Sequence, residues 1–254
     1  MRIATWNVNS LRVRLAHLLD WLKAAQPDVV CLQELKLPTN DFPFDALGEA
    51  GYEAAVHGQP GYNGVAILSR LEIEDVVEGF PGEEGQSRVI EALIEGVHVF
   101  SVYAPNGQDP KSEKFEYKQR FYEQLRAHLD RVADPAEPYV LGGDFNIAPD
   151  ERDVWDLKAC AGYIGFHPEE HKWLRKLTEW GLHDSLRLVT QEAGLFSWWD
   201  YRGFGYGKNR GMRIDQLWVS DALKGKVAKA WIDIDPRGWD KPSDHTPVLC
   251  ELKL

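Results

Sequence analysis

The sequence of 254 residues has no run of about 20 apolar residues, the length that a helix needs to cross a bilayer. Its three cysteines, Cys31, Cys160 and Cys250, are widely spaced, and two of them lie in apolar runs typical of buried strands. We therefore expect buried, reduced thiols rather than a disulfide or a zinc site. The first residues lack the pattern of a signal peptide and instead predict a strand. These absences together predict a cytoplasmic protein with no membrane segment.

The sequence also lacks an excess of positive charge. It has 29 lysines and arginines against 40 acidic residues, a formal net charge of −11, which argues against binding of nucleic acid by the molecule as a whole. Local charge matters more, because charges are screened beyond about 10 Å at 0.1 M salt. Between Tyr201 and Asp215 the charged side chains are Arg202, Lys208, Arg210 and Arg213. They form either a basic rim on an acidic body or an ordinary solvated loop.

Apolar periodicity predicts alternating strands and helices. Strands are expected at 2–8, 28–34, 52–57, 65–69, 89–95, 97–103, 139–143, 196–201, 214–220, 229–233 and 246–252, and helices at 10–25, 111–132 and 168–180. Ser10 is expected to cap the first helix. Gly96 alone separates two of the strands, so they must form an antiparallel hairpin. We therefore expect a single α/β domain over residues 1–254, built as a layered sandwich with mixed sheets rather than as a purely parallel sheet.

Polar side chains stand at the ends of expected strands that are far apart in the sequence. They are Asn7, Asn9, Glu34, Asp144, Asn146, Asp244 and His245. One fold can gather them into a single oxygen-rich site, which suits a hard cation that acts on a phosphate ester. The sequence has no cluster of cysteine and histidine, so magnesium or manganese is expected rather than zinc.

Strand geometry predicts which of these side chains point together. Asp144 and Asn146 are two residues apart and should point to the same side of an extended chain. Asp244 is adjacent to His245 and should point away from its ring, so another acid must orient the imidazole. Asp215 is the best candidate, which leaves Asp244 free for the metal or its waters.

The same residue types suggest a hydrolytic mechanism. Glu34, together with Asp244 or Asn7, can hold one divalent cation through oxygen. Asp144 can orient and deprotonate a water molecule. His245 can donate a hydrogen bond to a non-bridging phosphate oxygen. These roles predict a phosphodiesterase.

Six segments, in order over essentially the full length, resemble exonuclease III and the related apurinic/apyrimidinic endonucleases. They are Leu-Gln-Glu at 32–34, Asn-Gly-Val-Ala at 63–66, Gly-Gly-Asp-Phe-Asn at 142–146, Phe-Ser-Trp-Trp-Asp-Tyr-Arg at 196–202, Asn-Arg-Gly-Met-Arg-Ile-Asp at 209–215 and Ser-Asp-His at 243–245. The first, third and last are shared with a wider superfamily that includes deoxyribonuclease I, sphingomyelinases, inositol-phosphate phosphatases and deadenylases. Trp-Trp-Asp-Tyr-Arg at 198–202 and Arg-Ile-Asp at 213–215 narrow the resemblance to the DNA-repair branch.

The resemblance implies a four-layer α/β sandwich in which two mixed sheets pack together between helices. The implied metal residues are Asn7, Glu34 and Asp244; the implied catalytic residues are Tyr103, Asp144, Asn146, Asp215 and His245; Asn106 is expected beside the scissile phosphate, and Trp198, Met212 and Ile214 around the deoxyribose. A pocket with apolar walls admits a flipped-out sugar and leaves no room for a base. Arg202 and Arg210 of the basic segment are candidate contacts with the DNA backbone.

The sequence departs from the family pattern at three positions. Met212 replaces the usual Trp or Leu, and its flexibility would loosen the selectivity of the pocket. Asp109 stands where the mammalian enzymes have an arginine that intrudes into the duplex. Asn9 occupies a position that is acidic in those relatives, so a metal role for it is not expected.

The sequence thus predicts a monomeric, magnesium- or manganese-dependent DNA-repair nuclease that cleaves 5′ to abasic sites in duplex DNA. Exonuclease activity in the 3′–5′ direction and 3′-phosphatase activity are expected as well. One alternative is a phosphoesterase of the same superfamily that acts on RNA ends, lipids or inositol phosphates, and the segment at 198–202 argues against it. Another is a non-catalytic nucleic-acid-binding protein on this scaffold, and the intact Glu34 and Asp144 argue against that.

Overall fold

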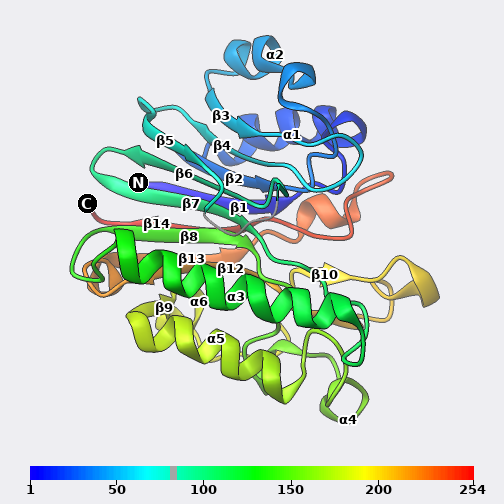
Figure 1. The fold of residues 1–254 in the computed structure, drawn as a ribbon. Helices are drawn as coiled ribbons and strands as arrows, with labels where there is room; N and C mark the ends of the chain where they lie inside the picture. Colours follow the sequence, from blue (N-terminus) through cyan, green and yellow to red (C-terminus); the bar gives the residue numbers. More distant parts are fainter. Residues whose placement is uncertain (81–84) are drawn as a thin grey trace.

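The computed structural model, which describes residues 1–80 and 85–254, has its elements arranged in four layers (Figure 1). Two six-stranded mixed sheets pack face to face, and helices cover their outer faces. The expected four-layer α/β sandwich is therefore confirmed.

The first sheet has the strand order β13-β14-β1-β2-β4-β3. Its strands are β1 (Arg2–Asn7), β2 (Val29–Gln33), β3 (Glu53–His57), β4 (Val65–Ser69), β13 (Val227–Ile232) and β14 (Val248–Leu252). Neighbouring strands are antiparallel except β1 and β2, which are parallel. A parallel pair needs a long crossover connection, and α1 (Leu11–Ala25) lies in it.

The second sheet has the strand order β5-β6-β7-β8-β12-β9. Its strands are β5 (Glu74–Glu78), β6 (Val89–Ile94), β7 (Val97–Tyr103), β8 (Tyr139–Asp144), β9 (Leu182–Asp184) and β12 (Asp215–Ser220). Its parallel pair is β7 and β8, with α3 (Glu113–Val132) in the crossover. The hairpin expected at Gly96 joins β6 and β7. A separate two-stranded ribbon pairs β10 (Trp198–Trp199) with β11 (Gly211–Met212).

The larger helices lie on opposite sides of the two sheets. In Figure 1, α1 and α2 (Phe44–Glu49) lie on the side of the first sheet, and α3 and α5 (Pro168–Trp180) on the side of the second. The remaining short helices are α4 (Leu157–Cys160), α6 (Ser185–Val189) and the 3-10 turns Thr39–Asp41, Glu151–Asp153, Arg202–Phe204, Lys224–Lys226 and Asp235–Gly238. Among the helices of residues 1–80 and 85–254, none is apolar over a length that could span a membrane.

Strand alternation builds the core in layers. Along β2, Val29 and Cys31 point between the two sheets, whereas Val30 and Leu32 pack towards α1. Each such fully buried aliphatic side chain contributes roughly 1.5–3 kcal/mol of transfer free energy. The three cysteines are buried free thiols, as expected.

Several expectations about local structure are wrong. Ser10 precedes α1, but its hydroxyl makes no capping hydrogen bond, and its φ of 86° is not that of an ordinary cap. Instead, its backbone N–H donates to the carbonyl of Glu34 at 2.8 Å, because the chain here wraps against the end of β2. The expected strand at 196–201 shortens to the two residues of β10. β5 was not expected, because its sequence Glu-Asp-Val-Val-Glu shows no alternation of apolar and polar residues. In the structure all of its side chains are exposed.

Arg213 does not belong to a basic rim. Its side chain is buried, with Nε 2.6 Å from Asp153 Oδ1 and Nη2 2.6 Å from Asp184 Oδ2. A buried charge needs such partners. The sequence around Arg213, a run of basic residues, does not indicate that Asp153 and Asp184 are its partners.

A stability prediction follows from Gly143, where β8 passes close to β7. A Cβ atom at this position would lie 2.0 Å from the carbonyl oxygen of Val102. Gly143→Ala must therefore displace backbone, and we expect it to lower the free energy of unfolding by about 3 kcal/mol. Unfolding in guanidinium chloride measures this. Gly225→Ala, where a Cβ atom meets open space, is the control and should change stability by less than about 0.5 kcal/mol. Equal stability of both variants would contradict the close approach.

Candidate active site

The carboxyl ends of both parallel strand pairs meet at one edge of the sandwich. In the first sheet, β1 ends at Asn7 and Glu34 directly follows β2. In the second sheet, Asp144 is the register partner of Tyr103 on one side and of Asp215 on the other. Sheet ends of this kind are where α/β proteins place their ligands. The register therefore brings together side chains from distant parts of the chain.

A cavity of about 240 Å³ opens at this edge. It is lined by Glu34, Tyr103, Asn106, Asp144, Asn146, Ile164, Gly165, Trp198, Met212, Ile214, Asp244 and His245. Apart from Ile164 and Gly165, every lining residue was expected at the site. Asn7 and Asp215 are fully buried behind them, and each hydrogen-bonds a lining residue.

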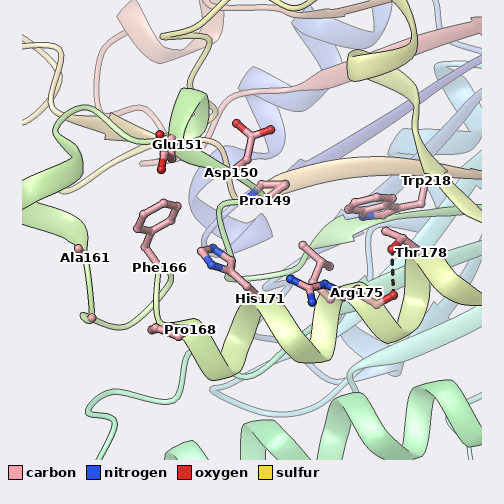
Figure 2. Close-up of a pocket in the computed structure, with 12 residues that line it drawn as sticks. Pro149, Asp150, Glu151, Ala161, Phe166, Pro168, His171, Arg175, Thr178 and Trp218 are labelled. Carbon is pink, nitrogen blue, oxygen red and sulfur yellow. Dashed lines mark hydrogen bonds between the residues drawn. The ribbon is translucent and has the colours of Figure 1, made fainter.

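A second cavity, of about 480 Å³, is lined by other residues, among them Pro149, Phe166 and His171 (Figure 2). Its walls come from the loop after β8 and from α5. One of its two carboxylates, Asp150, is held by the guanidinium of Arg152. The cluster of potential metal ligands found in the described residues lies in the smaller cavity, which is therefore the candidate site.

The side-chain amide of Asn7 lies between two carboxylates, one from each sheet. Its Nδ2 donates to Glu34 Oε1 and to Asp144 Oδ2, both at 2.9 Å. Its Oδ1 accepts the backbone N–H of Asn9 at 2.9 Å, which fixes the orientation of the amide. Hydrogen bonds to ionised carboxylates are stronger than those between neutral groups. Asn7 thus holds the two acids close together.

The imidazole of His245 is oriented by Asp215, as strand alternation predicted. Its Nδ1 lies 2.9 and 3.1 Å from the two carboxylate oxygens of Asp215. Ser197 donates its hydroxyl to Asp215 Oδ2 at 2.6 Å and so fixes the acid in turn. The other ring nitrogen, Nε2, lies 3.8 Å from Asp144 Oδ2. The ring therefore presents Nε2 to the cavity.

Burial and neighbouring charges shift both members of this pair. Burial disfavours the charged imidazole, but the carboxylates of Asp215 and Asp144 outweigh it and raise the pKa of His245 to about 10. Burial raises the pKa of Asp144 to about 7, although His245 and the amide of Asn7 oppose the shift. A carboxylate that titrates near neutral pH is suited to act as a general base, and a protonated imidazole as a donor.

Asn146 supports Asp144, but not through the extended geometry expected for it. Its φ is 52° and that of Asn9 is 44°, so both lie in the left-handed region that asparagine tolerates better than most residues. The Asn146 N–H donates to Asp144 Oδ1 at 2.9 Å. The Asn146 Oδ1 accepts from Asn106 Nδ2 at 3.0 Å. The side chains of Asn106 and Asn146 therefore lie at the cavity in a fixed arrangement.

The donor set at the cavity fits a hard divalent cation. One potential ligand atom from each of Glu34, Asp144 and His245 lies within 4.8 Å of the others. The two carboxylates suit magnesium or manganese. His245, with its raised pKa, is a poor ligand and a good donor.

Asp244 lines the cavity beside Asn9 and Trp198. Its Oδ1 accepts from Asn9 Nδ2 at 2.8 Å and its Oδ2 from Trp198 Nε1 at 3.0 Å. It lines the cavity but lies outside the cluster of three. Trp199, which the sequence could not separate from Trp198, is buried and donates to Asn209.

One wall of the cavity is apolar. Trp198, Met212 and Ile214 belong to one apolar cluster, and Ile164, which packs against another cluster, also lines the cavity. A Cβ atom on Gly165 would lie 3.2 Å from Met212 Cε, so a larger residue there would crowd the wall.

Arg202 and Arg210 are not brought to the cavity. The side chain of Arg202 is 92% exposed and its guanidinium bonds Asp200. The guanidinium of Arg210 lies over the ring of Trp155, 4.9 Å from its centroid. Both belong to the loop between β10 and β11.

Sequence reasoning missed Lys36 and Ser197, as well as Ile164 and Gly165. Lys36 Nζ lies 2.8 Å from Glu34 Oε2, where it partly neutralises the carboxylate. Its spacing of two residues from Glu34 was an available signal. Residues 148–167 show no strand or helix period, and nothing in their sequence indicates which of them reach the cavity.

Comparisons with known proteins agree with this geometry. The Endonuclease/Exonuclease/phosphatase family matches residues 4–245. Exodeoxyribonuclease III of Haemophilus influenzae is 36% identical, with all of both chains covered. A 3′ phosphatase from Neisseria, solved with product DNA hairpin, is 39% identical with a TM-score of 0.96, and an AP endonuclease from Archaeoglobus fulgidus is 35% identical with a TM-score of 0.96. Both structures cover the whole of each chain.

The charge of His245 gives a prediction for the metal-free protein. NMR titration of its ring should give a midpoint near pH 10, and Asp215→Asn should lower that midpoint by about two pKa units, because a neighbouring opposite charge is removed. Asp221→Asn, which removes the carboxylate beside His183, is the control. A wild-type midpoint below pH 7 would contradict the account.

The same shift links His245 to stability. Its pKa is raised above the value of 6.5 expected when unfolded, so its stabilising contribution is complete below that pH and is lost as pH rises towards about 10. In Asp215→Asn the loss of stability relative to wild type should therefore be larger at pH 6 than at pH 10. Thermal unfolding of the metal-free proteins at both pH values measures it, and an equal loss at both would count against the linkage.

Proposed function

The chain belongs to the endonuclease/exonuclease/phosphatase family, and we propose that it is a divalent-metal-dependent DNA-repair nuclease. It hydrolyses the phosphodiester on the 5′ side of abasic sites in duplex DNA, and it has 3′–5′ exonuclease and 3′-phosphatase activity. The observation that carries this proposal is the convergence of Glu34, Asp144 and His245 in one cavity beside an apolar wall.

The cation is a magnesium or manganese ion in this proposal. Glu34 would hold it, with Asn7 and Asp244 acting directly or through water. When bound, it polarises the phosphate and neutralises developing negative charge. Lys36 already contributes positive charge beside Glu34.

The other polar residues have separate roles in hydrolysis. Asp144 accepts a proton from the attacking water, in an orientation fixed by the Asn146 N–H. His245 donates from Nε2 to a non-bridging phosphate oxygen. Burial raises the pKa of Tyr103 well above its ordinary value, so its phenol keeps its proton and can donate as well.

The apolar wall accounts for substrate selection. Trp198, Met212 and Ile214 enclose a space that accepts a flipped-out sugar without a base. Arg202 and Arg210, exposed on the adjoining loop, contact the DNA backbone and offset locally the net charge of −11. Asn106 lies beside the phosphate, and Asp109 offers no wedge to the duplex.

We further propose that residues 1–254 form one catalytic domain, which acts as a monomer in the cytoplasm. Gel filtration with light scattering would test the oligomeric state.

The activity is tested on a duplex that contains one tetrahydrofuran abasic analogue. With magnesium, we expect a single cut on the 5′ side of the analogue, and with a chelator we expect none. Blunt and 3′-phosphate duplexes at the same salt concentration should show the exonuclease and phosphatase activities. Negligible cleavage of all three substrates with metal would reject the proposed function.

The role of Asp144 is tested by Asp144→Asn. Loss of a general base should slow cleavage about 100-fold or more, while the variant still binds the abasic duplex. Single-turnover rates and gel-shift binding measure the two properties. Asp130→Asn, on the exposed face of α3, is the control and should match wild type. Unchanged turnover in Asp144→Asn would remove this residue from its role.

A further inference from the structure

The segment at 145–148, which follows β8, has each of its four backbone carbonyls hydrogen-bonded by a side chain from another element. The donors are the Tyr122 hydroxyl to Phe145, Lys118 Nζ to Asn146, Gln216 Nε2 to Ile147 and His171 Nε2 to Ala148. These donors come from α3, β12 and α5. The left-handed turn that carries Asn146 is thus held from outside the cavity.

Lys118 is the charged member of this set that also reaches a second site residue. Its side chain is fully buried, and its Nζ lies 2.7 Å from the carbonyl of Asn146 and 3.2 Å from that of Asn106. The side chains of these two asparagines hydrogen-bond each other at the cavity. One ammonium group therefore holds the backbone of both.

Glu170 supplies the third acceptor. Its Oε1 lies 2.5 Å from Lys118 Nζ, and its Oε2 accepts the N–H of His167 at 2.9 Å. An ammonium group has three donors, and here all three have acceptors. Both side chains are fully buried, so each charge depends on the other.

We propose that Lys118, held by Glu170, is a positioning residue that fixes Asn106 and Asn146 for hydrolysis. Lys118 does not line the cavity, so it acts through the two carbonyls rather than on the substrate. The proposal rests on the proposed function, because its readout is the hydrolytic rate.

If the ion pair between Lys118 and Glu170 were purely structural, a variant that keeps its stability would also keep its hydrolytic rate. Removing one partner of a buried pair is strongly destabilising, whereas neutralising both can leave stability nearly unchanged. In Lys118→Met/Glu170→Gln no buried charge is left without a partner, and the glutamine can still accept from His167. The carbonyls of Asn106 and Asn146 nevertheless lose their common donor. This double variant separates stability from positioning.

The test compares melting temperature with kcat and KM on the abasic duplex. The double variant should melt within about 4 °C of wild type. Its kcat should fall on the order of 100-fold, because small displacements of positioned groups are costly, and its KM should change less than about threefold. A variant with wild-type Tm and wild-type kcat would overturn the proposal.

A matched control pair lies on α5, the helix that carries Glu170. Lys172 and Glu169 form an exposed ion pair, and Lys172→Met/Glu169→Gln should leave both Tm and kcat unchanged. If the double variant does not fold, Glu170→Asp tests the proposal instead. This substitution keeps both charges but moves the carboxylate away from Lys118 by the length of one methylene group. We expect its kcat to fall about tenfold with KM retained, and an unchanged kcat would overturn the proposal. An inactive wild-type protein would instead reject the proposed function.

Discussion

The amide of Asn7, which hydrogen-bonds one carboxylate from each sheet, joins the two halves of the site. Glu34 follows a strand of the first sheet and Asp144 ends a strand of the second, and two neighbouring carboxylates repel each other when both are charged. Asn7 donates to both, while the imidazole of His245 places positive charge 3.8 Å from the same Asp144 oxygen that accepts from Asn7. The arrangement requires both parallel strand pairs to end at the same edge, which is why the register of the two sheets determines the chemistry.

Much of the fold and the site could be predicted because strand ends are marked by composition. Apolar runs that end in an acid or an amide indicated Asn7, Glu34 and Asp144. Alternation argued against Asp244 as the partner of His245, which left Asp215 as the best candidate. The roles of Tyr103 and the apolar wall came from the family resemblance rather than from spacing. Spacing could not have assigned these roles, because Tyr103 and the residues of the apolar wall follow no period that separates them from core residues.

What the sequence did not reveal depends on tertiary partners. Arg213 resembles its exposed basic neighbours until Asp153 and Asp184 are brought to it by other segments. The left-handed conformation of Asn146 depends on the donors that hold its segment. The burial of Lys118 could have been predicted, because it lies three residues from Phe115 and three from Phe121 on the apolar stripe of α3. A lysine on a buried face indicates a partner, although the sequence alone does not identify it.

The claim on which the account rests is that a divalent ion binds between the two sheets. Anomalous diffraction from crystals grown with manganese tests it most directly. The account predicts an anomalous peak in the cavity at roughly 2.2 Å from a carboxylate oxygen of Glu34, a distance usual for oxygen ligands of such cations. A peak at another surface, with Glu34, Asp144 and His245 unchanged and without metal, would contradict it.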